Sequence, residues 1–278
     1  AFGSVIAQHA TNNAGIKVTA LAGNGSQANV QDLEDGNAEL AFCQSDVEAY
    51  AYEGKNLFDG APVDMISTVA ALYDEQVQIV TCNPDIKTVA DLKGKNVSIG
   101  AAGSGVYFNA IDILGAYDMT ENDTKPTYQS FGDSADALKD EKIDAAFIVA
   151  GAPTTAITDL STSKAAYLVS IDDAHIQKLL EKSEYYSKTV IPAGTYSTMT
   201  TDTTTVAVSA VIIARDDVSE DDVYKFVKDI FDNAPDLVSS HAKYKELSIE
   251  KATSISSVPY HKGAAKYFEE KGVKVTTK

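Results

Sequence analysis

A glycine-rich turn at residues 100–105 carries the clearest chemical signal in this sequence. Val97 and Ile99 alternate with polar neighbours before it, as in a short strand, and residues 106–117 have the apolar stripe of a helix. The unpaired N–H groups of a first helical turn attract an anion, and Ser104 adds a hydroxyl. Because no Lys-Ser/Thr pair follows the glycines, a carboxylate suits this turn better than a triphosphate. The alternative is a tight turn that binds nothing.

Two further polar clusters are expected where strands end. Leu40–Cys43 has the pattern of a short strand that leads into Gln44-Ser45-Asp46, and a strand predicted at Ile16–Ala22 leads into Gly23-Asn24-Gly25-Ser26. Ligands of open α/β sheets bind at the carboxyl ends of strands. Gln44 and Ser45 are therefore candidate ligand contacts, although Ser45 or Asp46 would also serve as the N-cap of a helix at Val47–Glu53.

The segment Gly23–Ala28 also fits the Gly-x-Gly-x-x-Ala pattern of dinucleotide-binding folds. Asp46 lies about 20 residues further on, where such a fold places the carboxylate that binds the ribose. This pattern predicts, as a remote alternative, an NAD-dependent dehydrogenase. The motif is short and degenerate, and no catalytic set follows it, so we expect neither an enzyme nor a cofactor.

The remaining reactive residues form no recognisable catalytic or metal site. The four histidines are scattered, and the sequence has neither a His-Glu-x-x-His nor a Gly-x-Ser-x-Gly motif. Cys43 and Cys82 lie in apolar strand-like segments and are interpreted as buried free thiols, although two cysteines suffice for one disulfide. Arg215 is the only arginine, and the two aspartates after it predict a weak surface ion pair. Backbone amides, hydroxyls and side-chain amides must therefore hold most of any anionic ligand.

The composition is that of a folded, acidic protein with one large or two medium domains. Its 278 residues are 44% hydrophobic, but no apolar run approaches the ~20 residues that span a bilayer. The formal net charge is −17, which a phosphate backbone would repel. This charge argues against nucleic acids and anionic membranes as partners.

Strand and helix patterns alternate along the chain, which predicts an α/β fold with parallel strands. Helices are expected at residues 1–13, 47–53, 88–93, 106–117, 134–139, 154–160, 172–182 and 220–231, with others before Gly36 and near residues 235–244 and 261–271. Strands are expected at residues 16–22, 40–43, 65–72, 76–81, 97–99, 127–131, 143–149, 166–170 and 206–214, and residues 185–205 should be irregular. We predict two lobes, lobe 1 at residues 1–79 and 206–278 and lobe 2 at residues 80–205, which can hinge shut on a ligand.

Short motifs follow one another in a fixed order over nearly the whole chain. They are Gly36–Phe42 with Gln44–Asp46, Ala70–Tyr73, Asp91–Lys95, Gly100–Gly105, Ser130–Gly132, Val149–Pro153, Ile191–Tyr196 and Pro259–His261. The ordered set resembles the TAXI-type solute-binding receptors of TRAP transporters. The Asp91–Lys95 motif alone is shared by many binding proteins, whereas the ordered set is specific.

The resemblance implies a type II periplasmic-binding-protein fold, with two α/β lobes joined by two hinge strands and the ligand cleft between them. It implies an extracytoplasmic receptor, periplasmic or lipid-anchored at the cell surface, that captures a small organic anion such as glutamate, glutamine or another carboxylate. A TRAP-type membrane permease would receive the ligand, and we expect the receptor to be a monomer. A lobe pair of this type could instead act as a ligand sensor or bind another ligand class, such as a thiamine precursor, an aromatic acid or a sulfonate.

Carried over position by position, the resemblance implies a pocket lined by Ser26, Gln44, Ser45 and Tyr73 from the first lobe and by Ser104, Gly105, Val106, Asn109 and Gly151 from the second. Such receptors often have Thr and a polar residue where this chain has Val106 and Tyr107. We therefore expect backbone amides to carry more of the anion site, and the ligand to be less polar than glutamate. The receptors also have a further strand and glycine-rich turn before the first helix, which here is missing or lies outside this numbering.

Overall fold

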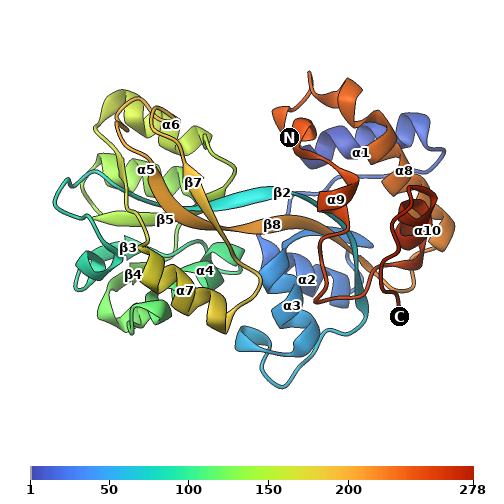
Figure 1. The fold of residues 1–278 in the computed structure, drawn as a ribbon, viewed down its shortest axis with the longest axis horizontal. Helices are drawn as coiled ribbons and strands as arrows, with labels where there is room; N and C mark the ends of the chain where they lie inside the picture. The colour runs from blue at the N-terminus through green and yellow to red at the C-terminus, as the bar shows by residue number, and fades with distance from the viewer. Residues whose placement is uncertain (1) are drawn as a thin grey trace. The chain divides into compact units, whose positions relative to one another are not determined.

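The computed structural model describes residues 2–278, and the chain forms two compact units (Figure 1). Unit 1 comprises the chain up to Tyr73 together with Ser209–Lys278, and unit 2 comprises Asp74–Val208. Two long strands, β2 (Ile66–Thr81) and β8 (Thr203–Arg215), each begin in one unit and end in the other. The second unit is thus an insertion between two strands that the first unit shares with it.

Unit 1 is built on the paired strands β1 (Leu40–Gln44) and β8, which run antiparallel with Leu40 opposite Ala214 and Gln44 opposite Ala210. Helices α2 (Ser26–Glu34) and α3 (Ser45–Glu53) pack beside β1. A second layer combines α1 (Phe2–Asn13), α8 (Glu220–Leu237), the short α9 (Ile249–Ala252) and α10 (Lys262–Glu270). Its core joins apolar residues of α1, α8 and α10 to strand residues such as Leu72 and Ile212.

Unit 2 has helices on both faces of a mixed sheet. Strand β5 (Ala145–Ala150) lies antiparallel to β2 and parallel to β3 (Asn96–Ser98), which pairs in parallel with β4 (Lys125–Thr127). The helices are α4 (Gly105–Ala116), α5 (Phe131–Lys139), α6 (Thr155–Ser163) and α7 (Asp173–Lys182), and two further strands, β6 (Tyr167–Leu168) and β7 (Ser187–Ile191), pair with β2 and β8.

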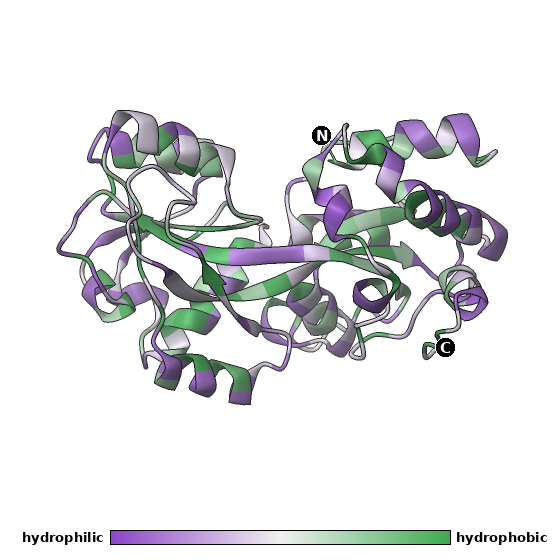
Figure 2. Ribbon diagram, turned by 45° about the horizontal axis from the view of Figure 1, so that its top comes forward, coloured by the Kyte–Doolittle hydropathy of each residue, from purple (hydrophilic) through white to green (hydrophobic). Residues whose placement is uncertain are grey.

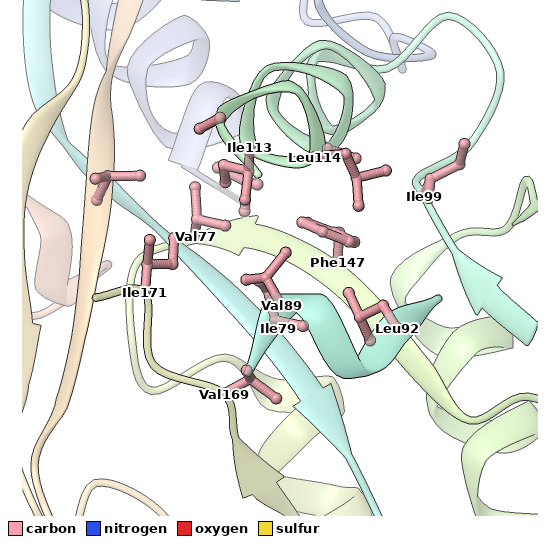
Figure 3. Packing of buried hydrophobic residues seen from close by; sticks show 14 of the residues in the cluster. Val77, Ile79, Val89, Leu92, Ile99, Ile113, Leu114, Phe147, Val169 and Ile171 are labelled. Carbon is pink, nitrogen blue, oxygen red and sulfur yellow. The ribbon is translucent and has the colours of Figure 1, made fainter. Parts of the chain in front are cut away.

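The sheet of unit 2 has an apolar core on each of its two faces, because successive side chains of a strand point to opposite faces of the sheet. Val77 and Ile79 of β2 and Phe147 of β5 pack against α4 on one face (Figure 3). Val80 of β2 and Ile148 of β5 pack on the other face, against residues of α5 and α6. Helix α7 adds Ile176 and Leu179 to the first of these cores and turns its charged residues outward, as the hydropathy colouring in Figure 2 shows.

Several predictions about the elements are wrong, each for a local reason. The sheet is mixed, not parallel, because β2 and β8 each pair antiparallel with their neighbours. Residues 16–22 form no strand, since no neighbouring strand pairs with them, and Leu21 is 74% exposed. The two strands expected at residues 65–72 and 76–81 are one continuous strand, β2.

Three further boundaries also differ from the prediction. The strand expected at residues 127–131 ends at Thr127, and Ser130 instead caps α5. Residues 185–205 are not all irregular, because they contain β7 and the start of β8. Helix α3 begins at Ser45, so its N-cap is Gln44 and neither Ser45 nor Asp46.

Candidate functional site

The nine predicted ligand residues fall into two groups, one in each unit. Ser26, Gln44, Ser45 and Tyr73 belong to unit 1, and Ser104, Gly105, Val106, Asn109 and Gly151 belong to unit 2. Six of them lie at, or directly before, the first residues of helices α2, α3 and α4, and Gly151 lies four residues before the first residue of α6.

These four helices share an unusual feature at their N-termini. Within residues 2–278, no side chain of the N-cap residue accepts a hydrogen bond from the first turn of α2, α3, α4 or α6. The other five helices with a described cap, α5 and α7–α10, are each capped by a side chain, from Ser130, Asp172, Ser219, Ser248 and His261. An uncapped first turn leaves N–H groups that water or a ligand must satisfy. The uncapped helices are those to which the sequence assigns the ligand.

Among the four uncapped helices, α4 has the strongest evidence that a ligand binds at its N-terminus. Ser104 is its N-cap, with extended backbone (φ −85°, ψ 154°), yet its hydroxyl does not cap the helix. The Ser104 Oγ atom is buried and has no hydrogen-bond partner among the described residues. A buried hydroxyl without a partner costs about 1–3 kcal/mol, so it points to a group that binds there.

Gly100 holds the turn against the start of α4. Its φ is +92°, and a Cβ added there would lie 2.6 Å from Cβ of Val106 and 2.8 Å from Oγ of Ser104. Only glycine fits both the left-handed backbone and this close approach. Val106 is 5% exposed and packs in the core of unit 2, so it can offer a ligand its N–H group but not its side chain.

Asn109 and Gly151 have partners inside unit 2. Asn109 Nδ2 donates a hydrogen bond to the hydroxyl of Tyr186 (2.9 Å), which in turn donates to Asp112 Oδ2 (2.8 Å). Gly151 O accepts a bond from Thr154 Oγ1, and the N–H of Thr154 donates to the hydroxyl of Tyr196 (2.8 Å). The start of α6 is therefore partly satisfied by the protein itself, unlike the start of α4.

In unit 1 the two predicted serines hold the backbone of the site. Ser26 Oγ accepts a hydrogen bond from the N–H of Gln44 (3.1 Å), and Ser45 Oγ accepts one from the N–H of Ser209 (3.1 Å). Gln44 is only 5% exposed, and its Oε1 atom has no hydrogen-bond partner within the described part of the chain. Gln44 is thus the residue of this group whose side chain carries an unused acceptor.

Tyr73 lies in an aromatic cluster that the sequence did not reveal. The ring of Phe2 meets Tyr73 edge-on at 5.3 Å between centroids, and Lys243 Nζ lies 5.2 Å from the centroid of the Tyr73 ring. Lys243 also pairs with Glu246 at 2.5 Å. Phe2 could be assigned to the apolar face of its helix, but the helix expected near residues 235–244 gave no sign that Lys243 would lie beside Tyr73. It places a cation beside a predicted ligand residue in a chain with one arginine.

That arginine is used elsewhere, as predicted. Arg215 Nε donates to Asp217 Oδ1 at 3.0 Å, and its second nitrogen lies 2.5 Å from Asp217 Oδ2. Both cysteines are free thiols, as predicted, but only Cys43 is buried, whereas Cys82 is half-buried. Burial raises the pKa of both thiols, which makes them poor nucleophiles.

The structure does not provide the strand that the dinucleotide-binding pattern at Gly23–Ala28 requires. Such a motif must follow a strand, and residues 16–22 form none. Asp46 is fully buried in unit 1, so its carboxylate is not exposed to a ribose.

Within residues 2–278 no three His, Cys, Asp or Glu side chains gather as a metal site would require, and none of the helices is long and apolar enough to cross a membrane.

Comparison with known proteins places this architecture. The profile of the NMT1-like family matches residues 1–272. Similar solved structures include the alkanesulfonate-binding protein SsuA from Xanthomonas axonopodis pv. citri bound to MOPS (TM-score 0.55, 15% identity, 96% of this chain and 79% of that one). Others are the periplasmic aliphatic sulphonate binding protein SsuA from Escherichia coli (0.52, 14%, 97% and 86%) and an ancestral arginine-binding protein bound to arginine (0.53, 15%, 88% and 84%). The chain therefore has the fold of type II periplasmic solute-binding proteins, and it belongs to the NMT1-like family.

Proposed function

We propose that this protein is an extracytoplasmic solute-binding receptor that captures a small organic anion and delivers it to a TRAP-type membrane permease. The anion would be an amino acid such as glutamate or glutamine, or another carboxylate. The fold supports capture without catalysis, since the similar structures are named as binding proteins for sulfonates and arginine. The ordered motifs from Gly36 to His261 support the TAXI type of receptor.

The uncapped start of α4 is the main support for the proposal that the ligand is an anion. The amides of its first turn lack a side-chain cap, and Ser104 Oγ is buried without a partner among the described residues. A carboxylate placed there would accept hydrogen bonds from those amides and from the Ser104 hydroxyl, and the helix dipole would favour its charge. No guanidinium is required, which matches a chain whose only arginine is engaged with Asp217.

We propose a division of labour among the predicted residues. Ser104 and the amides of Gly105 and Val106 bind the anionic group, and Gln44 binds a second polar group of the same ligand. Ser26 and Ser45 position the backbone at the start of α3, as their bonds to Gln44 and Ser209 support. Asn109 and Gly151 fix the framework of unit 2, and β2 and β8 act as hinge strands between lobe 1 (residues 1–79 and 206–278) and lobe 2 (residues 80–205).

Two serine substitutions with opposite expected effects test the anion site. Ser104→Ala removes no cap bond and takes away a buried hydroxyl without a partner among the described residues, so stability without ligand should not fall and should rise by up to about 1–3 kcal/mol. It should weaken carboxylate binding about 10- to 100-fold, the value of one hydrogen bond to a charged group. Ser219→Ala removes the cap of α8, so it should lower stability by about 1 kcal/mol and leave affinity unchanged.

The measurement is isothermal titration of refolded, ligand-free protein with amino acids, keto acids, dicarboxylates and sulfonates, beside urea unfolding of each variant. A carboxylate that binds Ser104→Ala as tightly as the wild type would show that the anion is held elsewhere. Binding of sulfonates in place of carboxylates would change the ligand class. Failure of every acid to bind would contradict the receptor proposal.

A further inference from the structure

Phe42 is an exposed aromatic residue two positions before Gln44, whose Oε1 atom has no hydrogen-bond partner among the described residues. Residues 42 and 44 lie two apart on β1, so their side chains point to the same face of the strand. Phe42 is 36% exposed, although β1 is otherwise shielded and its next residue, Cys43, is buried. A buried polar atom without a partner calls for an explanation, and the exposed ring on the same face of the strand offers an apolar surface to the group that would supply the partner.

One side of the Phe42 ring is fixed by helix α1. The ring of Phe2 meets it at 6.2 Å between centroids and an interplanar angle of 70°. A Cβ added to Gly3 would lie 2.8 Å from Cε2 of Phe42, so the glycine lets the helix backbone approach the ring closely. The carbonyl of Phe42 is also held, by a bond from Asn29 Nδ2 (2.8 Å). Phe42 is thus held by its contacts with α1 and by the bond to its carbonyl, while part of its side chain stays exposed.

The adjacent polar group sets a second requirement. Gln44 Oε1 is buried and has no partner among the described residues, so a ligand that covers it must supply an N–H or O–H donor. The backbone beneath it is fixed by the bond from the N–H of Gln44 to Ser26 Oγ. The Gln44 acceptor and the Phe42 ring, on one face of β1, therefore favour a ligand with a flat, apolar group that carries a hydrogen-bond donor.

We infer that the ligand is an aromatic carboxylic acid that bears an amino or hydroxyl group, with its ring stacked on Phe42 and its donor bonded to Gln44. This inference rests on the proposed receptor function and names the class of anion. A ring stacked on an aromatic side chain adds specific attraction beyond its buried area. A site built to bond a donor also rejects the analogue that lacks it, because the buried acceptor is then left unpaired.

Titration calorimetry with four matched acids tests the inference: 4-hydroxyphenylacetate, phenylacetate, cyclohexylacetate and glutarate. We expect the hydroxylated aromatic acid to bind about 10-fold or more tightly than phenylacetate, and phenylacetate to bind more tightly than cyclohexylacetate and glutarate. Phe42→Ala should remove the preference for aromatic over cyclohexyl acids, and Gln44→Met should remove the preference for the hydroxyl. Tyr167→Ala is the control, because Tyr167 has the same 36% exposure but lies on β6, away from the predicted residues.

The outcomes separate this inference from the proposed function. If glutarate binds as tightly as the aromatic acids, or if Phe42→Ala leaves the ranking unchanged, the aromatic inference is wrong and the receptor proposal stands. If none of the four acids nor the wider acid panel binds, both are wrong. Equal losses in Tyr167→Ala and Phe42→Ala would show a general effect of removing a ring, and would also overturn the inference.

Discussion

Replacing Glu48 by glutamine should make the protein more stable at alkaline pH and remove most of the pH dependence of its unfolding. Glu48 lies on α3 with 0% exposure. Burial raises its pKa from 4.5 to about 8, and a hydrogen bond from Thr68 opposes this only in part. The folded protein therefore keeps Glu48 protonated at neutral pH.

The hydrogen bonds around Glu48 agree with a neutral carboxyl group. Thr68 Oγ1 lies 2.5 Å from Glu48 Oε1 and 3.2 Å from the carbonyl oxygen of Val258. The single hydroxyl hydrogen of Thr68 cannot serve both acceptors fully. A protonated Glu48 donates to Thr68 Oγ1 and leaves that hydrogen for Val258, so both contacts are satisfied.

The sign of the pH effect follows from proton binding. Between about pH 4.5 and 8 the unfolded chain loses the proton of Glu48 while the folded protein retains it, so stability falls as the pH rises. The contribution is fully present below the lower value and declines by about 1.4 kcal/mol per pH unit, to a total of about 5 kcal/mol. Glu48→Gln supplies a neutral donor to Thr68 at every pH, so it should show little of this decline.

Urea unfolding at pH 5, 7 and 9 measures the difference. The control is Glu53→Gln on the same helix, where Glu53 forms a surface ion pair with Lys55 and should contribute less than about 1 kcal/mol. Wild-type and Glu48→Gln proteins whose unfolding free energies fall in parallel from pH 5 to pH 9 would disprove the role given to Glu48.

Gly100→Ala should both destabilise unit 2 and abolish tight anion binding. The alanine would be forced into a left-handed backbone at φ +92°, and its Cβ would meet Val106 and Ser104 at 2.6 and 2.8 Å. The backbone contributes about 1 kcal/mol to the loss and the steric overlap about 1–3 kcal/mol more. The overlap pushes against the two residues proposed to bind the carboxylate, so we expect affinity to fall about 100-fold.

Gly194→Ala separates the two causes. Gly194 has a similar φ of +79°, but no atom lies within 4 Å of its added Cβ. It should lose about 1 kcal/mol of stability and keep its affinity. Thermal unfolding and calorimetric titration of both variants are needed, and equal affinities would show that the glycine turn takes no part in binding.

The sequence predicts the helices better than the strands, for a physical reason. A helix such as α7 or α8 is coded by its own apolar stripe and cap, whereas a strand exists only where another strand pairs with it. Residues 16–22 have a strand-like pattern but no pairing neighbour. The polar residues Asp74 and Glu75 suggested a break, yet the backbone pairing of β2 continues to Thr81.

The candidate site shows the same limit. The sequence could locate polar residues at the starts of α3 and α4, because a strand leads toward each of these helices, and at the start of α2, although the strand expected before α2 does not form. It could not tell a hydroxyl with a backbone partner from one without, since Ser45 is bonded to a residue 164 positions away. Phe42 and Lys243 were missed because their proximity to predicted residues depends on the packing of α1 and of the segment after α8.

The most direct test of the central claim is to observe the amides of α4 while a small organic anion binds. Proton–nitrogen correlation spectra of labelled protein, titrated with the tightest acid from the calorimetric panel, report each N–H group separately. We predict saturable downfield shifts at Gly105, Val106 and Tyr107, with no change at the capped first turn of α8, which follows Ser219. An acid that saturates the protein while these three amides stay unshifted would contradict anion binding at the start of α4.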